Sequence, residues 1–559
     1  MSKNKFFHEV KQMRQLFSKL YRLSCNFILM LSLVFTGLLF IAGFLFTCYA
    51  DNMTTQQVLT KIDNPFLQIL GILLFIGALF FCSNLACKHP AKSKKILLCI
   101  TFSWILLSGG LLVLFGRTAP AADAWSVYSS AQSLALGDTS VIHPTDSYLS
   151  YYPQQVGLMA FFESIIRLWN LLSIGLEPYH FIKCLYVVLT CVIVFYQYKI
   201  VHTLWEDDRA DCIYLILAAT NLPMIMYSSF VYGEIPSFTA MSLGLYYLVV
   251  LLKNSFSDQS RQEQIPLSGR RIATQGILSL MGLTLAVMLR KNSLIIIIAV
   301  VLVVLLEWCR SRKHLLLLYC ILCITLSLTI LPATQKIYEL RAGNKLQTGV
   351  PAMSYFAMGM QESSRGNGWY NGFNFNTYLE SGMDTAKTVT ISKEAIAERQ
   401  AYFKENPEYA CSFYFNKFLS QWADGTYASR QATLATLGPR HPIAEEFYTG
   451  KFTGAYIGFC NLYQSVIYLG CFAGFFMILF KRRTNRLYSW FGMIGVFGGF
   501  LFHMIWEANS RYIFLYGLLL LPYAARGLSD ISNTSVLGKF RQNTADRKED
   551  ANKKPPIAG

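Results

Sequence analysis

The stretch YYPQQVGLMAFFESIIRLW, residues 151 to 169, decides the fold, because its placement fixes the side of the membrane on which all later loops lie. It is nearly long enough to cross a bilayer, but Glu163 and Arg167 stand one helical turn apart within it. If it does not cross, the basic segments 88–95, 310–313 and 481–486 share one side with the C-terminal tail, as the positive-inside rule requires. If it crosses, the later segments face outward. We therefore predict an interfacial helix on the outer face, begun by Pro153 in its first turn.

The composition places the rest of the chain in the same membrane. Hydrophobic residues make up 53% of the 559 residues and charged residues only 14%, which leaves too little polar surface for a soluble protein of this size. Apolar runs of about 20 residues recur, and each can span a hydrocarbon core of about 30 Å. We predict an all-α polytopic membrane protein with about twelve transmembrane helices, at 27–48, 66–86, 96–116, 180–200, 213–230, 235–252, 273–290, 292–309, 314–332, 456–480, 488–505 and 509–526.

The net charge of +17 is explained by topology rather than by nucleic acid. In a soluble domain such a charge would suggest nucleic-acid binding, but here much of it lies between apolar segments, where it orients the chain and faces anionic lipid. The predicted partners therefore include membrane lipid and exclude nucleic acid. Both termini are predicted to be cytoplasmic. Most cysteines lie within or beside apolar segments, where they act as small hydrophobes, and their spacing indicates no disulfide framework.

This topology divides the chain into five parts. We predict a cytoplasmic lead and two extra transmembrane helices (1–95), a membrane module with a large outer loop at 117–179 (96–332), an extracytoplasmic insertion of mixed but mostly helical structure (333–455), the C-terminal transmembrane helices (456–526) and a disordered cytoplasmic tail (527–559). Within the insertion, the sequence around Asn406-Pro407 predicts two helices broken at that point.

The stretch AADAWSVYSS follows the third span and carries one carboxylate, Asp123. If the segment is helical, Asp123, Ser126 and Ser130 share one face while apolar residues, including Tyr128, form the other. An acid near a helix N-terminus stabilises the helix dipole, which is one interpretation of Asp123. The other is a general base that acts at the outer membrane surface.

Further ionisable groups are predicted at the outer ends of the spans. SSFVYGEIPSF places Glu234 in a very short connection between two helices, where a buried charge costs about 3 kcal/mol unless it is solvated or paired. Glu234 is therefore either a functional acid or an arginine-paired structural carboxylate. Arg290 and Lys291 lie in a tight outer turn, and Glu507 and Arg511 lie at the entrance of the last span. The basic residues either snorkel to headgroups or hold a phosphate, and Glu507 and Arg511 are also spaced to pair with each other.

Aromatic residues near these groups are predicted to contact substrate. ESSRGNGWYNGFNFNTY, from Glu362, presents Trp369 and Tyr370 beside amides, and the outer loop presents Tyr128 and Tyr152. The alternative for the Trp369 loop is a packed cover over the site. Arg365 is a further phosphate contact in this interpretation. The histidines show no metal-ligand spacing, so no metal site is predicted and a requirement for a divalent metal stays open.

These residues carry a resemblance to a known family. The segments DAWSVYSSAQSLALGD, YLSYYPQQVGLMAFFESI, YGEIP, RKNSLII and WEANSRYIFLYGLLLLPYAA resemble the GT-C superfamily of integral-membrane glycosyltransferases, nearest to the branch of protein O-mannosyltransferases and aminoarabinose transferases. The likeness covers residues 96–526. It implies a catalytic base at Asp123 and a polyprenyl-phosphate sugar as donor. Several branches have two adjacent acids where this chain has Asp123 and Ala124, so Glu234 is the predicted second acid.

We therefore expect a glycosyltransferase that moves a sugar from a polyprenyl-phosphate carrier to a cell-wall polymer, glycolipid or protein at the outer face of a bacterial cytoplasmic membrane. The lipid phosphate is the leaving group, so neither a nucleotide nor any other cofactor is expected. Two alternatives stay open, a polymerase or ligase of lipid-linked glycans and a transporter or flippase. Transporters place charges or broken helices at mid-membrane, whereas the ionisable residues here gather at the outer boundary.

Overall fold

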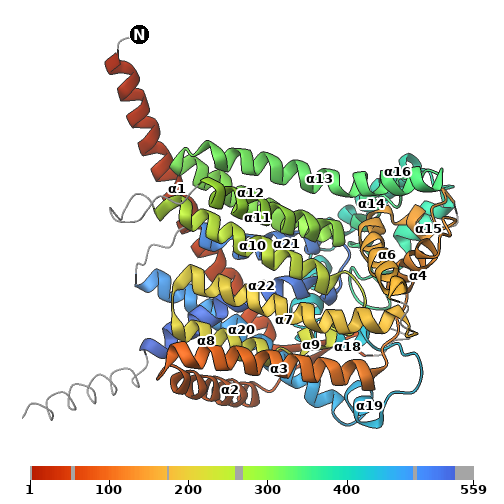
Figure 1. The fold of residues 1–559 in the computed structure, drawn as a ribbon, viewed down its shortest axis with the longest axis horizontal. Coiled ribbons are helices and arrows are strands. Elements are labelled where there is room, and N and C mark those ends of the chain that lie inside the picture. Colours follow the sequence, from red (N-terminus) through yellow and green to blue (C-terminus); the bar gives the residue numbers. More distant parts are fainter. Residues whose placement is uncertain are drawn as a thin grey trace, which may run out of the picture.

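A computed structural model describes residues 3–51, 57–145, 147–172, 175–257, 269–481 and 487–534. Within these ranges, eleven helices are long and apolar enough to cross a membrane, and they run side by side as one bundle (Figure 1). They are α1 (Lys3–Leu45), α2 (Pro65–Ala86), α3 (Pro90–Gly116), α7 (Pro178–Trp205), α10 (Glu234–Ser257), α11 (Gly269–Leu289), α12 (Leu294–Ser311), α13 (His314–Ala342), α20 (Thr453–Phe480), α21 (Phe491–Ile505) and α22 (Ser510–Thr534). The predicted all-α polytopic class is confirmed.

The span predicted at 213–230 is a broken helix. It consists of α8 (Asp208–Ala219) and α9 (Leu222–Tyr227), separated at Asn221, whose Oδ1 accepts a hydrogen bond from the Met224 amide at 3.1 Å. Pro223 stands in the first turn of α9. The pair lies alongside α7 (Figure 1), and it is not among the eleven long apolar helices. Helix α1 begins at the end of the bundle where α22 finishes.

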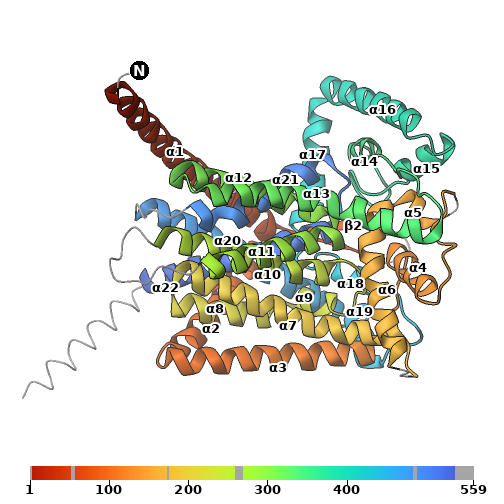
Figure 2. The same ribbon diagram turned by 45° about the horizontal axis from the view of Figure 1, so that its top comes forward.

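The stretch that decides the topology lies across the bundle instead of along it. It forms α5 (Tyr148–Tyr151), the 3₁₀ turn η1 (Pro153–Gln155) and α6 (Val156–Leu171), and α6 is nearly perpendicular to the spans (Figure 2). Glu163 of α6 pairs with Arg167 at 2.7 Å and with Arg341 of α13 at 2.5 Å. Both arginines also donate to the Leu134 carbonyl at the end of α4 (Asp123–Ala135). We call the end of the bundle with α4 and α6 the loop end.

A β-hairpin at the loop end lies where the sequence predicted the end of a span and a connecting loop. Strands β1 (Phe46–Ala50) and β2 (Val58–Ile62) pair antiparallel, with Cys48 opposite Thr60. The Cys48 amide also donates to the carbonyl of Ala423 at 2.9 Å, so the hairpin joins the first span to the insertion. Residues 46–62 are rich in β-branched and aromatic side chains, which favour this extended pairing over a helical continuation.

The insertion is mostly helical, as predicted, and gathers at the loop end (Figure 2). The helix break at Asn406-Pro407 is confirmed, since one helix ends at Glu405 and the next begins at Pro407. The helices are α14 (Ala352–Met358), α15 (Phe373–Glu380), α16 (Thr385–Glu405), α17 (Pro407–Trp422), α18 (Ser429–Ala432) and α19 (Pro442–Tyr448), and the remaining turns in the membrane bundle are η2 (Lys291–Ser293) and η3 (Leu487–Trp490).

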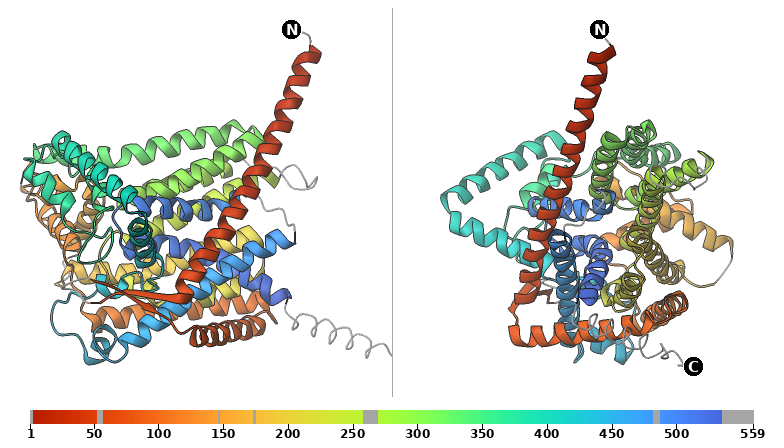
Figure 3. Two further views of the ribbon diagram at one scale, coloured as in Figure 1. Left: turned by 180° about the vertical axis from the view of Figure 1, so that it is seen from behind. Right: turned by 90° about the vertical axis from the view of Figure 1, so that its left-hand side faces the viewer.

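Two predicted features at the opposite end are only partly visible. Helix α22 continues to Thr534, past the end of the span predicted at 526, and the rest of the predicted tail lies outside the described residues. Of the basic segment 481–486, only Lys481 belongs to the described ranges. Figure 3 shows α1 crossing the bundle obliquely and projecting beyond it at this end.

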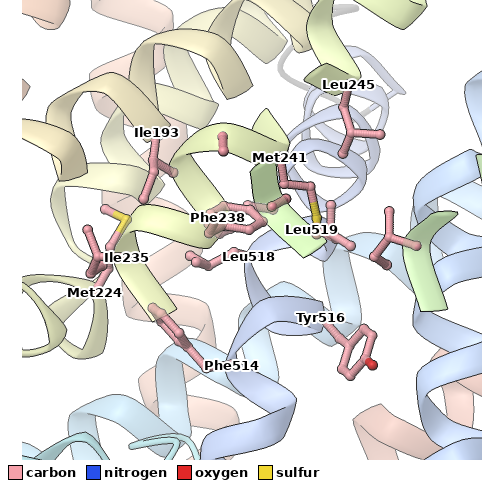
Figure 4. Packing of buried hydrophobic residues seen from close by; sticks show 14 of the residues in the cluster. Ile193, Met224, Ile235, Phe238, Met241, Leu245, Phe514, Tyr516, Leu518 and Leu519 are labelled. Carbon is pink, nitrogen blue, oxygen red and sulfur yellow. The ribbon is translucent and has the colours of Figure 1, made fainter. Parts of the chain in front are cut away.

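The core of the bundle is apolar and closely packed. Figure 4 shows Phe238 and Met241 of α10 against Leu518 and Leu519 of α22, all nearly fully buried. Helices α20 and α22 approach through glycines: a Cβ on Gly527 would lie 1.9 Å from the Gly470 carbonyl oxygen. Such small residues let helices associate in a membrane, where the hydrophobic effect does not drive them together.

Candidate active site

The site is built on three helix termini that meet at the loop end. Glu234 is the first residue of α10, Arg290 follows the last residue of α11, and Arg511 lies in the first turn of α22. Arg290 Nη1 forms an ion pair with Glu234 Oε1, and Arg511 Nε lies 3.7 Å from the same oxygen. The cluster carries one more positive than negative charge, next to the positive dipole ends of α10 and α22. It is therefore suited to hold an anion.

Glu234 lies against two arginines, the arrangement expected in one of the two interpretations that the sequence left open. Its carboxylate is buried, and its Oε1 is ion-paired with Arg290 Nη1 and lies 3.7 Å from Arg511 Nε. Removing one partner of such a buried pair is costly, because it leaves an uncompensated charge. Glu234 thus acts here as the counter-ion that positions the two arginines.

Tyr512 connects this cluster to a second carboxylate. Its ring lies under both guanidinium groups, 5.9 Å from the Arg290 Cζ and 5.6 Å from the Arg511 Cζ. Its hydroxyl donates to Glu507 Oε2 at 3.4 Å. Glu507 is buried between α21 and α22, and this burial raises the pKa of its carboxyl to about 7, with the charge of Asp123 adding to the rise and Arg511 opposing it. Arg511 is thus ion-paired with Glu234. The sequence spacing of Glu507 and Arg511, one helical turn apart, had also allowed those two residues to pair.

The charge of Asp123 acts on this group, since it contributes to the raised pKa of Glu507. Asp123 is the exposed first residue of α4, and the backbone before it is strained because Ala122 has φ 47°. Burial raises the pKa of Tyr148, and the charge and hydrogen-bonding capacity of Asp123 raise it further. Burial followed by the Asp123 charge also raises the pKa of Tyr152. The Asp123 charge therefore acts on Glu507, Tyr148 and Tyr152. The sequence predicted Asp123, Glu507 and Tyr152 as site residues, and Tyr148 lies close to Tyr152 in the chain.

The Trp369 loop lies against the Glu507 loop through backbone pairing. The Ala508 amide donates to the Gly368 carbonyl at 2.7 Å, and Trp369 and Ala508 form an isolated parallel bridge. Burial, and then the Glu507 charge, raise the pKa of Tyr370, so its hydroxyl is within electrostatic reach of Glu507. Arg365 lies 5.2 Å from the Tyr370 ring and its charge lowers the pKa of Glu507. The sequence predicted Tyr370 as a substrate contact and Arg365 as a phosphate contact, and both roles stay predictions.

Three predicted contacts lie elsewhere. The Trp369 indole is only 1% exposed and donates to Ser420 Oγ at 3.0 Å, so it supports the loop and presents no face to a substrate. Tyr128 is buried on the apolar face of α4, with its ring edge-on to Tyr179 at 5.3 Å. Lys291 is exposed in η2, and the described residues give it no ion pair.

Lys417 of α17 is a residue of the site that sequence reasoning missed. Its ammonium is buried beneath the Glu507 loop and donates to the Gly359 carbonyl at 2.5 Å and the Trp506 carbonyl at 2.8 Å. Burial lowers the pKa of Lys417 to about 7, and Glu507 opposes the shift. Gly368 fits closely over it, since a Cβ there would lie 2.8 Å from the lysine Cε. Lys417 thus holds three backbone segments together, and the only sequence signal was a lysine on the apolar side of a helix.

Asp424 is a second missed residue and joins the insertion to α22. Its carboxylate is buried and accepts hydrogen bonds from Thr426 N at 2.9 Å, Thr426 Oγ1 at 2.6 Å, Ala428 N at 3.1 Å and Ser510 Oγ at 2.6 Å. Ser510 immediately precedes Arg511. Asp424 therefore fixes the start of α22, and with it the guanidinium group of Arg511.

For metals, the described part of the chain contains no group of three or more His, Cys, Asp or Glu side chains that would hold an ion.

Comparisons with known proteins find no close relative and only low structural similarity to solved structures. No family model matches the chain, and no curated protein matches it. Among solved structures, it is similar to the oligosaccharyltransferase AglB of Archaeoglobus fulgidus in complex with an inhibitory peptide and a dolichol-phosphate, with 14% identity and a TM-score of 0.44 over 83% of this chain and 53% of that one. The apo form gives 13% identity and a TM-score of 0.44 over 81% and 52%. The form tethered to an acceptor peptide gives 12% and 0.43 over 78% and 49%. The chain thus spans about half the length of these structures.

Proposed function

We propose that this protein transfers a sugar from a polyprenyl-phosphate carrier to a hydroxyl-bearing acceptor at the loop end of the bundle. The observation that carries the proposal is an exposed carboxylate, Asp123, whose charge acts on Glu507, while Tyr512 beside Glu507 lies against two partly buried arginines, Arg290 and Arg511. A transferase of this kind needs a base for the acceptor and cations for the leaving phosphate. Both stand at the ends of spans, where a lipid-borne phosphate lies.

The chemistry is a single displacement. The acceptor hydroxyl gives its proton to the Asp123 carboxylate while its oxygen bonds to the anomeric carbon. The bond from that carbon to the phosphate oxygen breaks, and the electron pair leaves with the lipid phosphate. Arg290 and Arg511 hold the phosphate and stabilise the charge that develops on it. The configuration at the anomeric carbon is inverted.

The residues between base and arginines would bind the sugar. Tyr148 and Tyr152 stand beside Asp123, and Tyr370 and Tyr512 stand beside Glu507. Aromatic rings that carry hydroxyl groups fit the apolar faces and hydroxyls of a sugar. A Glu507 carboxyl with a pKa of about 7 is partly protonated near neutrality, and its protonated form can donate a hydrogen bond to a sugar hydroxyl without placing a negative charge next to the departing phosphate. Glu234 is not needed as a second acid in this scheme, because it serves as counter-ion to the arginines.

The orientation in the membrane belongs to the same proposal. The loop end faces away from the cytoplasm of a bacterial cell, and both termini are cytoplasmic, because this arrangement keeps the basic connections inside. The donor then reaches the site from the outer leaflet. The acceptor is a cell-wall polymer, a glycolipid or a protein.

A donor panel tests this function. Purified protein in lipid nanodiscs is incubated with polyprenyl-monophosphate sugars that are radiolabelled in the sugar, and free lipid phosphate and labelled acceptor are measured. We expect turnover with at least one monophosphate donor. Turnover only with diphosphate-linked oligosaccharides would assign the protein to the lipid-linked glycan polymerases or ligases. Movement of lipid across the membrane without bond cleavage would assign it to the flippases.

A further inference from the structure

An apolar surface of the insertion lies between the ends of two membrane spans. Segment 437–452 contains α19 and follows directly on residues that pair with the end of α3. Four of its large apolar side chains are between 44% and 61% exposed: Phe447, Phe452, Leu437 and Ile443. The rings of Phe447 and Phe452 lie against each other, with centroids 5.2 Å apart. Single exposed apolar residues are ordinary, but a cluster of this size on a short segment indicates an interaction surface.

Backbone hydrogen bonds fix the level of this surface relative to the membrane. The Leu437 amide donates to the Arg117 carbonyl at 2.9 Å, and the His441 amide donates to the Phe115 carbonyl at 3.1 Å. The His441 ring also stacks on Phe115 at 4.6 Å. The segment then leads into α20, which begins at Thr453. It is therefore held at the boundary where the spans α3 and α20 leave the bilayer.

The exposed surface of α3 is apolar up to the same level. Leu107, Leu111, Leu114 and Phe115 are all exposed along this span, so lipid contacts it to its last turn. Leu437 and Ile443 continue this surface beyond the end of the helix. The opposite side of α19 is already occupied, because Tyr448 is buried and donates to Thr433 Oγ1 at 3.0 Å.

We infer that segment 437–452 inserts its apolar side chains into the lipid leaflet at the loop end and so forms a second interfacial contact, separate from α6. The occupant of this surface is lipid, because the surface is continuous with a lipid-facing span at the depth of the hydrocarbon boundary. Basic residues stand at the edge of the segment, Arg117 and Lys451, where phosphate headgroups would lie.

The contact has a consequence for the site. The Ala119 amide donates to the Ala435 carbonyl at 2.8 Å, and Thr118 forms a bridge with Thr436. This short pairing joins the lipid-facing segment to residues 118–119, which lead into Asp123. The depth of Asp123 would thus be set by lipid on this side and by α6 on the other. The lipid contact itself does not depend on the proposed transferase activity.

Photo-crosslinking tests the inference without an activity assay. Benzoylphenylalanine is placed singly at Ile443 or at Phe447 in the full chain, which is reconstituted in nanodiscs with radiolabelled phospholipid and irradiated. Leu114 in α3 is the lipid-facing reference, and Gln400, exposed on α16, is the water-facing one. Only preparations that elute as a single species are compared, and Leu437 replaces either position if one of the two variants does not fold.

We expect lipid labelling at Ile443 and Phe447 equal to that at Leu114 and well above that at Gln400. Labelling that falls to the level of Gln400 would overturn the inference. Crosslinks between two copies of the chain in place of lipid would also overturn it, because they would assign the surface to a dimer interface. These results stand whether or not the donor panel detects sugar transfer.

Discussion

Arg511 Nε lies 3.7 Å from Glu234 Oε1, although the two residues are far apart in sequence and each begins a different helix. Of the three predicted acids, Glu234 and Glu507 are buried and Asp123 is exposed, so we propose that Glu234 supports the arginines and Asp123 meets the acceptor. The carboxylates of Glu234 and Asp123 therefore differ in their pairing with arginine as well as in their burial.

The first prediction concerns this division of roles. Replacing Arg511 by Gln removes a cation from the leaving phosphate, and we expect turnover to fall about 10² to 10³-fold. Glu234→Gln keeps the shape and leaves both arginines charged, so we expect a much smaller loss, seen mainly in KM for the donor. A Glu234→Gln variant as inactive as one without Asp123 would show that Glu234 is the base.

The second prediction concerns pH. Because the pKa of Glu507 is raised from 4.5 to about 7, the carboxyl loses its proton as the pH rises through 7. Ionised Glu507 lies close to the phosphate and repels it, so we expect activity to decline above pH 7. In Glu507→Gln this alkaline decline should disappear.

Lys417 must be separated from this effect, since its pKa is also about 7. Lys417→Arg keeps the positive charge at all these pH values. A decline that persists in Glu507→Gln but vanishes in Lys417→Arg would transfer the titration to the lysine and contradict the prediction.

The third prediction concerns the anchoring role of Lys417. In Lys417→Met the carbonyls of Gly359 and Trp506 lose their donor inside the protein, and we expect a loss of about 1–3 kcal/mol in unfolding free energy. Chemical denaturation in detergent measures it. The matched control is Lys404→Met, an exposed lysine on α16, which should leave stability unchanged. Equal stability of the two variants would mean that Lys417 is not an anchor.

The fourth prediction concerns helix packing. A methyl group on Gly527 cannot fit at 1.9 Å from the Gly470 carbonyl oxygen, so Gly527→Ala must separate α20 from α22 and lower the melting temperature. Gly77 of α2 has no atom within 4 Å of its added Cβ. Gly77→Ala should therefore be neutral, or stabilising by up to about 1 kcal/mol. Equal melting temperatures for the two variants would refute the close approach.

The sequence predicted those features that follow from local periodicity and charge. The crosswise placement of α6 followed from the Glu163 and Arg167 pair and from the basic loops, and the break at Asn406-Pro407 followed from proline chemistry. The β-hairpin was missed, because its pairing with Ala423 depends on a segment far away in the sequence. Membrane spans are apolar on most sides, so periodicity did not show which residues face each other across the bundle.

For the site, the sequence indicated which types of residue belong together but not their partners. Asp123, Glu507, Tyr152 and Tyr370 do gather at the loop end. Trp369 was predicted to bind substrate, yet its indole packs inward onto Ser420. Lys417 and Asp424 were missed because their importance comes from backbone carbonyls, amides and a serine on other segments, which no local pattern reveals.

The central claim is tested most directly by sugar transfer in Asp123→Asn. The amide keeps the size of the side chain but cannot accept the acceptor proton as a carboxylate does, so we predict turnover reduced by about 10² to 10⁴-fold while yield and melting temperature match the wild type. The measurement is release of lipid phosphate from the active monophosphate donor in nanodiscs. Wild-type turnover in this variant would contradict the account.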